Sequence, residues 1–158
     1  MAPFVVRGAA AGDIQGIADC LRSAFEPYRG DYTPDAFRDT VPTTVAIGLR
    51  LAEMSLFVAI SDTGEIAGTI GFKLVDGVEG HVRGMAVRPG HQGAGVAQQL
   101  LDAVEAELRR RRCSRISLDT TAPLRRAMAF YERNGFRRSG RVSDFYGMPL
   151  VEYVKTLR

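Results

Sequence analysis

The sequence predicts a mixed α/β (α+β) fold with a mostly antiparallel sheet of about seven strands and flanking helices. Three observations support this prediction. Short apolar and β-branched runs are separated by turn residues, amphipathic segments of helical period stand between some of these runs, and residues 80–121 have the pattern of one strand–helix–strand crossover. A chain of 158 residues is long enough for one core, so we expect residues 1–158 to form a single domain.

The first third of the chain is expected to contain one strand and three helices. Apolar residues at helical spacing predict a helix over residues 13–25, and the polar, aromatic segment 26–34 predicts a loop. Thr33 followed by Pro34 is the pattern of an N-cap and the first helical position. In chain order we expect a strand at 4–9 and helices at 13–25, from 34 toward 41 and at 44–54.

The rest of the chain is expected to contain six strands and two helices. An amphipathic helix should begin near Gly95, with Asp102, Glu105 and Arg109 away from its apolar face. Gly135 is well placed to end a second helix, over 125–134. The expected strands are 55–61, 66–75, 80–87, 115–121, 136–145 and 150–157.

Composition limits the class of protein. Hydrophobic residues make up 46% and charged residues 25% of the chain, as in an ordinary globular protein. No apolar run approaches the ~20 residues of a membrane span and no signal peptide is recognisable, so we expect a cytoplasmic protein with no membrane partner. Cys20 and Cys113 are expected to be reduced thiols. Two histidines and two cysteines without close pairs predict no metal site.

The charges are unevenly distributed along the chain. Residues 1–80 carry 6 basic and 11 acidic side chains, whereas residues 81–158 carry 15 basic and 7 acidic ones. The second half is therefore the natural place to bind an anion, either a phosphorylated cofactor or nucleic acid. Because the arginines are scattered over helix ends and strands rather than interleaved with aromatic residues, we do not expect a nucleic-acid partner.

The segment RPGHQGAGVAQQLL, residues 88–101, leads from a strand into a helix. The first N–H groups of a helix have no intrahelical partner, and together with the helix dipole they form an anion site. Gly93 and Gly95, with only methyl groups between and after them, would let a bulky anion approach these N–H groups. Glycines that merely permit a tight turn are the alternative. Gln98 stands where a dinucleotide fingerprint would have its third glycine, so that pattern is incomplete.

Two motifs resemble the GNAT superfamily of acetyl-CoA-dependent N-acyltransferases. One is Gln92-Gly93-Ala94-Gly95-Val96-Ala97, which fits Gln/Arg-x-x-Gly-x-Gly/Ala, and the other is AMAFYERNGF at 127–136. The resemblance covers roughly residues 55–157 and implies a sheet splayed at its centre. It also implies transfer of an acetyl group from acetyl-CoA to a small-molecule or peptide amine by direct attack in a ternary complex, and a homodimer.

The resemblance assigns residues to the binding of acetyl-CoA. The pyrophosphate is expected on the backbone N–H groups of Gln92, Gly93, Ala94, Gly95, Val96 and Ala97, and the pantetheine arm on the backbone of Met85, Ala86 and Val87. The Val87 N–H would polarise the thioester carbonyl, and Gly84 is expected to form a bulge. Leu124 replaces an asparagine that is frequent in the family, and Arg125 or Arg126 would compensate for that loss.

The resemblance also indicates catalytic residues. Tyr131 matches the tyrosine that protonates the leaving thiolate in many family members. His81 is expected as the general base with Glu79 on the same strand face, and Asp119 is a third candidate. Packing of the Tyr131 ring on the core, and a half-exposed strand histidine, are the structural alternatives. His91 is expected to pack.

The acceptor amine is expected between the loop 26–34 and the last hairpin. Aromatic surface would come from Tyr28, Tyr32, Phe145 and Tyr146, and Glu26 and Asp31 would attract a cationic amine. Two other functions remain open on the sequence. A nucleotide-binding oxidoreductase module would use Gly93-x-Gly95 but requires several strand–helix–strand units, and a non-enzymatic nucleic-acid-binding domain would use the basic half.

Overall fold

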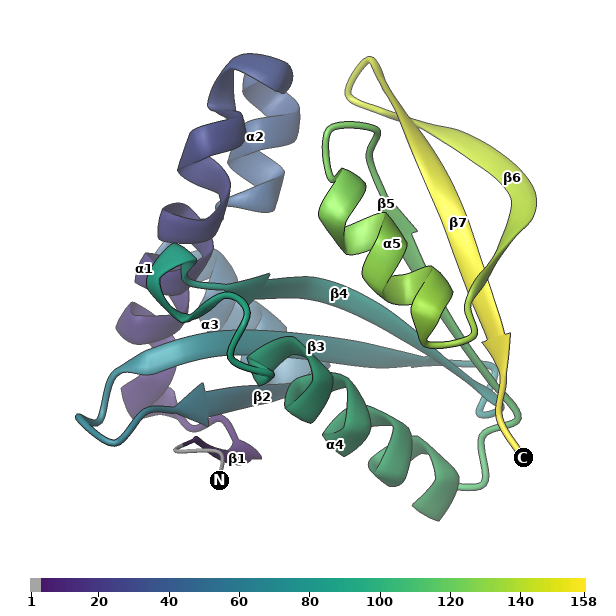
Figure 1. The fold of residues 1–158 in the computed structure, drawn as a ribbon, viewed down its shortest axis with the longest axis horizontal. Coiled ribbons are helices and arrows are strands. Elements are labelled where there is room, and N and C mark those ends of the chain that lie inside the picture. The colour runs from purple at the N-terminus through teal and green to yellow at the C-terminus, as the bar shows by residue number, and fades with distance from the viewer. Residues whose placement is uncertain (1–3) are drawn as a thin grey trace.

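The computed structural model describes residues 4–158. Its strands are β1 (Val5–Gly8), β2 (Ser55–Ile60), β3 (Ile66–Val75), β4 (Glu79–Val87), β5 (Arg115–Thr120), β6 (Arg137–Phe145) and β7 (Met148–Thr156). Its α-helices are α1 (Ile14–Phe25), α2 (Pro34–Thr40), α3 (Thr44–Glu53), α4 (Val96–Arg110) and α5 (Arg125–Arg133). The strands form one sheet in the order β1-β2-β3-β4-β5-β7-β6, in which β4 and β5 are parallel and the other neighbours antiparallel (Figure 1). The mixed, mostly antiparallel fold predicted from the sequence is confirmed.

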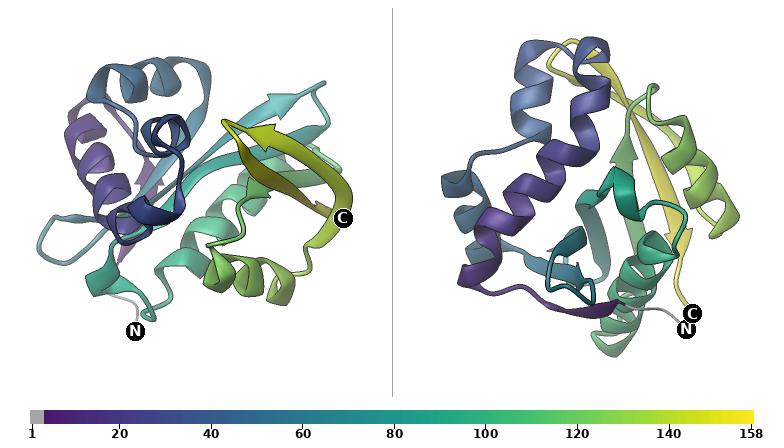
Figure 2. Two further views of the ribbon diagram at one scale, coloured as in Figure 1. Left: turned by 90° about the horizontal axis from the view of Figure 1, so that it is seen from above. Right: turned by 60° about the vertical axis from the view of Figure 1, so that its left-hand side comes forward.

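The helices cover both faces of the sheet. Seen from above in the left view of Figure 2, α1, α2 and α3 lie on one side and α4 and α5 on the other. Ile17, Leu21 and Ile47 pack from α1 and α3 onto one face, while Leu100 and Tyr131 belong to the core on the other face. Each helix is therefore held by one apolar face, as the sequence pattern requires.

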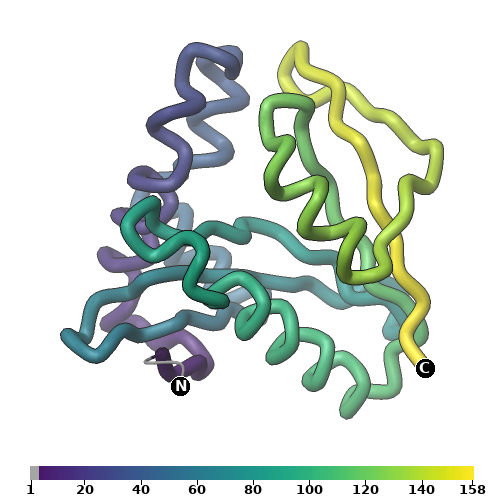
Figure 3. The backbone as a smooth tube through the Cα atoms, viewed as in Figure 1, coloured from purple at the N-terminus to yellow at the C-terminus, as the bar shows by residue number. Residues whose placement is uncertain are grey.

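The sheet opens at its centre between β4 and β5. The two strands pair in parallel register from Glu79 opposite Arg115 to Val82 opposite Leu118, and then diverge, β4 toward the left and β5 upward in Figure 3. Gly84 lies where the register between β3 and β4 shifts, and its φ of 71° is in the left-handed region that favours glycine. The predicted bulge at Gly84 is confirmed, and it bends β4 where the two strands separate.

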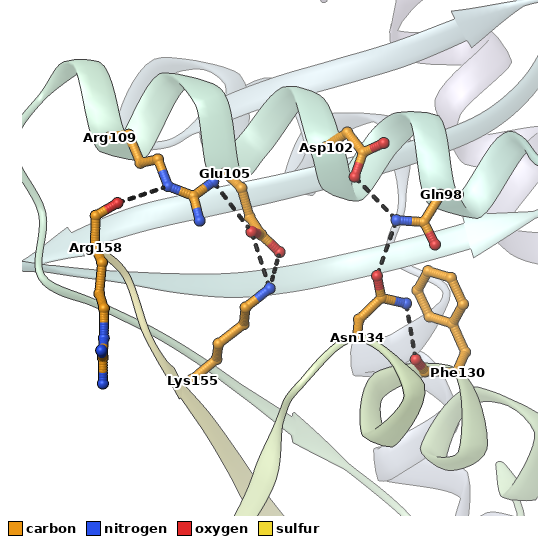
Figure 4. A network of polar contacts seen from close by, with 8 residues as sticks. All are labelled: Gln98, Asp102, Glu105, Arg109, Phe130, Asn134, Lys155 and Arg158. Carbon is orange, nitrogen blue, oxygen red and sulfur yellow. Dashed lines mark hydrogen bonds and ion pairs between the residues drawn. The ribbon is translucent and has the colours of Figure 1, made fainter.

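Polar contacts hold α4 against the elements that follow β5 (Figure 4). Gln98 donates to the Asn134 side chain at the end of α5 over 2.8 Å, and Lys155 on β7 lies 3.0 Å from both oxygens of Glu105. The predicted position of Glu105 on the polar face of α4 is wrong: its side chain is buried because the Lys155 ammonium compensates its charge there. These contacts bridge the two sides of the opening.

The segment 26–34 is more regular than expected. Glu26–Asp31 forms a 3-10 helix with a proline at its start, and Glu26 pairs with Arg29 at 2.8 Å. One short 3-10 helix leaves no apolar periodicity in a sequence, so the prediction of a loop missed it.

In the part of the chain that the structure describes, none of the helices has both the length and the apolar character needed to span a membrane.

Close packing of α4 on the sheet fixes the position of its first turn. A Cβ at Gly68 on β3 would lie 2.8 Å from Val96, 2.9 Å from Leu100 and 3.1 Å from the Ala86 carbonyl oxygen. We therefore expect Gly68→Ala to lower the free energy of unfolding by about 1–3 kcal/mol through overpacking. Chemical denaturation should show this loss, whereas Gly12→Ala, where a Cβ has no neighbour within 4 Å, should show much less of it. Equal stability of the two variants would contradict the packing argument.

Candidate functional site

The corner between β4 and α4 exposes backbone N–H groups. Gly93 and Gly95 have φ values of 82° and 83°, and the first hydrogen bond of α4 joins the Gln99 N–H to the Gly95 carbonyl over 3.1 Å. Within residues 4–158, the N–H groups of Gly93, Ala94 and Gly95 donate to no protein acceptor. With the positive end of the α4 dipole, they form a site for an anion.

A cavity of about 440 Å³ extends from this corner between the end of β4 and α5. Its lining includes nine of the ten residues predicted to bind the cofactor, namely Met85, Ala86, Val87, Gln92, Gly93, Gly95, Val96, Ala97 and Arg126. Ala94, the tenth, is exposed and lies outside this lining. The structure therefore brings together the strand and loop segments that the sequence selected.

The backbone of β4 points its free groups into this cavity. The Arg88 N–H donates to the Ala67 carbonyl on β3 over 2.8 Å, and N–H directions alternate along a regular strand, so the Val87 N–H faces away from β3. Gln92 donates from Nε2 to the Val87 carbonyl over 3.2 Å, and Arg126 on α5 donates to Gln92 Oε1 over 3.3 Å. Arg126 thus reaches the loop from the opposite wall.

A second cavity, of about 380 Å³, adjoins the first. The linings share Phe25, Met85, Leu124 and Tyr131. Leu124, the residue just before α5, makes no side-chain hydrogen bond to the helix and supplies apolar surface to both cavities. A reaction between two bound molecules could therefore take place at the four shared residues.

Tyr131 lies at this junction. Its side chain is 7% exposed, and its hydroxyl donates to Met85 Sδ over 3.6 Å. Burial raises the pKa of Tyr131 to about 12, so the phenol keeps its proton at neutral pH. Its ring also packs edge-on against Phe136. The core-packing reading and a proton-donating hydroxyl are thus both compatible with this position.

His81 belongs to a hydrogen-bonded group across β4 and β5. Its Nδ1 lies 2.8 Å from Ser117 Oγ, its Nε2 lies 3.2 Å from Asp119 Oδ2, and Ser117 donates to Glu79 Oε2 over 2.6 Å. Because the single Ser117 proton is used on Glu79, Ser117 accepts from His81 Nδ1, which leaves Nε2 as the atom directed to Asp119. His81 and Asp119 line the second cavity; Glu79 does not.

Sequence reasoning missed Ser117. The parallel register places Ser117 directly opposite His81, with Glu79 and Asp119 two residues away on the same faces. A strand prediction gives the face of each residue but not the register between strands that are distant in the chain, so Ser117 carried no signal beyond its strand.

The described residues contain no group of three metal-ligating side chains close enough to hold an ion.

The surroundings of the second cavity differ in part from those expected. Tyr32 and Phe145 line it, Tyr28 lines the first cavity, and Tyr146 lies outside both linings. Glu26 and Asp31 are outside both linings, and Glu26 pairs with Arg29 at 2.8 Å, so their attraction for a cationic amine stays a prediction. Arg50, Arg83 and Asp39 supply charge instead.

His91 is held by neighbours at the edge of the first cavity. Its ring meets Phe4 edge-on with centroids 5.5 Å apart, and its Nε2 lies 3.0 Å from Glu65 Oε1. Both contacts hold the His91 ring in place. This agrees with the prediction that His91 packs.

Comparison with known proteins decides between the families considered. The sequence model of the Acetyltransferase (GNAT) family matches residues 14–136, which is most of the chain. The chain belongs to the GNAT family. The doubly wound sheet of an oxidoreductase module is not formed by residues 4–158, in which β4–α4–β5 is the single parallel crossover.

One curated protein and two solved structures resemble this GNAT protein in sequence or in fold. The uncharacterized protein YdhI of Bacillus subtilis is 33% identical over 88 residues, which are 56% of this chain and 53% of YdhI, so the match spans about half of that relative. A GNAT acetyltransferase from Staphylococcus aureus Mu50 superimposes with a TM-score of 0.79 at 20% identity, covering 98% of this chain and 99% of the other. The PaiA N-acetyltransferase of Thermoplasma acidophilum, solved in complex with coenzyme A, superimposes with a TM-score of 0.80 at 16% identity, covering 97% of this chain and 98% of the other.

Proposed function

We propose that this GNAT protein transfers an acetyl group from acetyl-CoA to the amine of a small-molecule or peptide acceptor, by direct attack within a ternary complex. The observation that carries the proposal is the continuous path from the free N–H groups at Gly93–Gly95, along the backbone of β4, to Tyr131, where the second cavity begins. A thioester carrier has a diphosphate at one end and an acyl group at the other. Its groups therefore follow the same order as the N–H groups, the β4 backbone and Tyr131 along this path.

The residues present fit such a carrier. A Cβ at Gly95 would have no protein atom within 4 Å, so the space beside its N–H is open to a bulky diphosphate. The Val87 N–H can pair with an amide carbonyl of an extended arm, as a neighbouring strand would. The guanidinium of Arg126 adds a positive charge on the α5 side.

The proposed step uses groups at the junction of the cavities. The acceptor amine attacks the thioester carbon, the new C–N bond replaces the C–S bond, and the departing thiolate takes the Tyr131 proton. The Val87 N–H stabilises the negative charge that develops on the carbonyl oxygen. The proton lost by the amine passes to the His81–Asp119 pair, in which Nε2 and Oδ2 lie 3.2 Å apart. Glu79 acts through Ser117 by fixing the His81 ring.

Replacement of His81 tests the base. We expect His81→Gln to lower kcat roughly tenfold, less than full loss of a general base, because Asp119 and water remain as proton acceptors. Steady-state rates, with unfolding curves as a check of the fold, measure this effect. An unchanged kcat in a folded variant would remove His81 from the mechanism.

Acetyl-CoA binding and thiol release test the function as a whole. Calorimetric titration should show binding of acetyl-CoA and of CoA, and a panel of amines should then reveal acceptor-dependent release of free thiol. A folded protein that binds neither carrier would overturn the proposal. Binding with no acceptor-dependent release by any amine would leave a CoA-binding protein and would contradict the acetyl-transfer step.

Two further expectations belong to this proposal. A homodimer is supported by β6, an edge strand with exposed side chains whose outer backbone groups are free to pair. A cytoplasmic location is supported by Cys20 and Cys113, which are both buried free thiols. Light scattering of the purified protein tests the first, and fractionation of the source cells tests the second.

A further inference from the structure

We propose that the acceptor carries an oxyanionic group, a carboxylate or a phosphate, in addition to its amine, and that Arg50 and Arg83 bind this group in the second cavity. The inference rests on the acetyl transfer proposed above, because it assigns that cavity to the acceptor. It concerns the class of acceptor, which neither the family nor the fold specifies.

Arg50 supplies the first observation. It lies in the last turn of α3, its side chain is half-buried, and its guanidinium lines the second cavity. Nη2 donates to the Asp39 carbonyl over 3.0 Å, and Nη1 lies over the β4 bulge, 3.3 Å from where a Cβ of Gly84 would stand. A guanidinium has five N–H donors, and one of them is used here.

The charge of Arg50 is not balanced by a carboxylate of its own. In the part of the chain that the structure describes, no carboxylate forms a salt bridge with Arg50. Burial lowers the pKa of Arg50, and the nearby positive charge of Arg83 lowers it further, while Asp39 acts in the opposite direction. A guanidinium remains charged in spite of such a shift. An anion bound beside Arg50 would therefore stabilise the half-buried positive charge.

Arg83 supplies the second observation. Its Nη2 lies 3.0 and 3.1 Å from the two carboxylate oxygens of Asp39, so this carboxylate pairs with Arg83 and not with Arg50. Arg83 is two residues from His81 on β4, and both side chains line the second cavity. Their Cα atoms are therefore about 7 Å apart along the strand. The cavity has an acid–base pair, His81 and Asp119, on one side and a net positive group on the other.

This arrangement suits an acceptor with an amine at one end and an oxyanion at the other. The planar guanidinium fork matches carboxylate and phosphate oxygens in pairs. A purely structural role is the competing explanation, because Arg50 also satisfies a carbonyl in the last turn of α2. The two explanations differ in one respect: a structural contact affects all acceptors equally, whereas an anion site affects only anionic ones.

The test uses matched pairs of acceptors. Glycine, β-alanine and 4-aminobutyrate are each compared with their carboxamides, and ethanolamine phosphate with ethanolamine. We expect at least one anionic member to exceed its neutral counterpart roughly tenfold in kcat/KM, the effect of one charge-assisted hydrogen bond. In Arg50→Gln this ratio should fall to near one while the neutral acceptor keeps its rate. Arg22→Gln, an exposed arginine of α1, should keep the wild-type ratio.

The arms of the experiment separate the outcomes. A preference confined to the carboxylate pairs, or to the phosphate pair, identifies the anion. Neutral acceptors that match the anionic ones, or an Arg50→Gln variant that loses both equally, would overturn the inference. If Arg50→Gln does not fold, Arg83→Gln is measured in its place.

Binding measurements keep this inference separate from the proposed function. Calorimetry with CoA is performed on the wild type and on each variant. CoA binding without discrimination between paired acceptors refutes the anion site alone, whereas absence of CoA binding refutes the acetyl transfer on which it rests. If no pair is acetylated, the same pairs are titrated into the CoA-bound protein, and lack of a preference for the anionic member counts against the inference.

Discussion

Tyr131→Phe is expected to lower kcat by roughly 10²–10⁴-fold, the range for loss of a general acid. The hydroxyl stands at the junction of the two cavities, where the proposed transfer takes place, and donates to Met85 Sδ over 3.6 Å. Because burial raises the pKa of Tyr131 to about 12, the phenol keeps its proton well into the alkaline range. Loss of this acid by deprotonation should therefore not limit the rate at neutral pH.

The same variant should bind acetyl-CoA with little change, since phenylalanine keeps the ring that packs against Phe136. Stopped assays of thiol release give kcat, and calorimetry gives the affinity. Tyr146→Phe is the matched control, because that ring is 53% exposed and lies outside both cavities. A Tyr131→Phe protein with wild-type turnover would show that the side chain only packs on the core.

Gly95→Asn is expected to weaken CoA binding by roughly a hundredfold or more. Asparagine tolerates the left-handed backbone conformation that Gly95 adopts, and a Cβ there would touch no protein atom, so the fold should be retained. The added side chain would occupy the space in which a diphosphate meets the N–H groups of the corner. Losing about two charge-assisted hydrogen bonds accounts for the size of the effect.

Gly64→Asn controls for the backbone conformation. Gly64 has a φ of 86° in the turn between β2 and β3, and a Cβ there is equally free of neighbours. This variant should bind CoA as the wild type does, with a comparable change in unfolding free energy. Full CoA affinity in Gly95→Asn would mean that the anion does not sit at this corner.

Local patterns predicted the elements of this fold well, because strand alternation, caps and turn glycines act over a few residues. The glycines of the 88–101 segment and the Tyr131 motif also identified the first cavity, since each motif lies within one continuous stretch. Arg50, Ser117 and the buried Glu105 were not predicted in their roles. Each depends on a neighbour from a distant strand or helix, and such contacts follow from register and helix packing rather than from local sequence.

The two cavities meet at only four residues, and their other walls come from different elements. Donor and acceptor can therefore enter and leave through separate openings, and neither has to precede the other. For the proposed transfer, this favours random-order addition, with double-reciprocal plots that intersect. The same separation lets CoA dissociate before or after the acetylated product, so the two products need not be released in a fixed order.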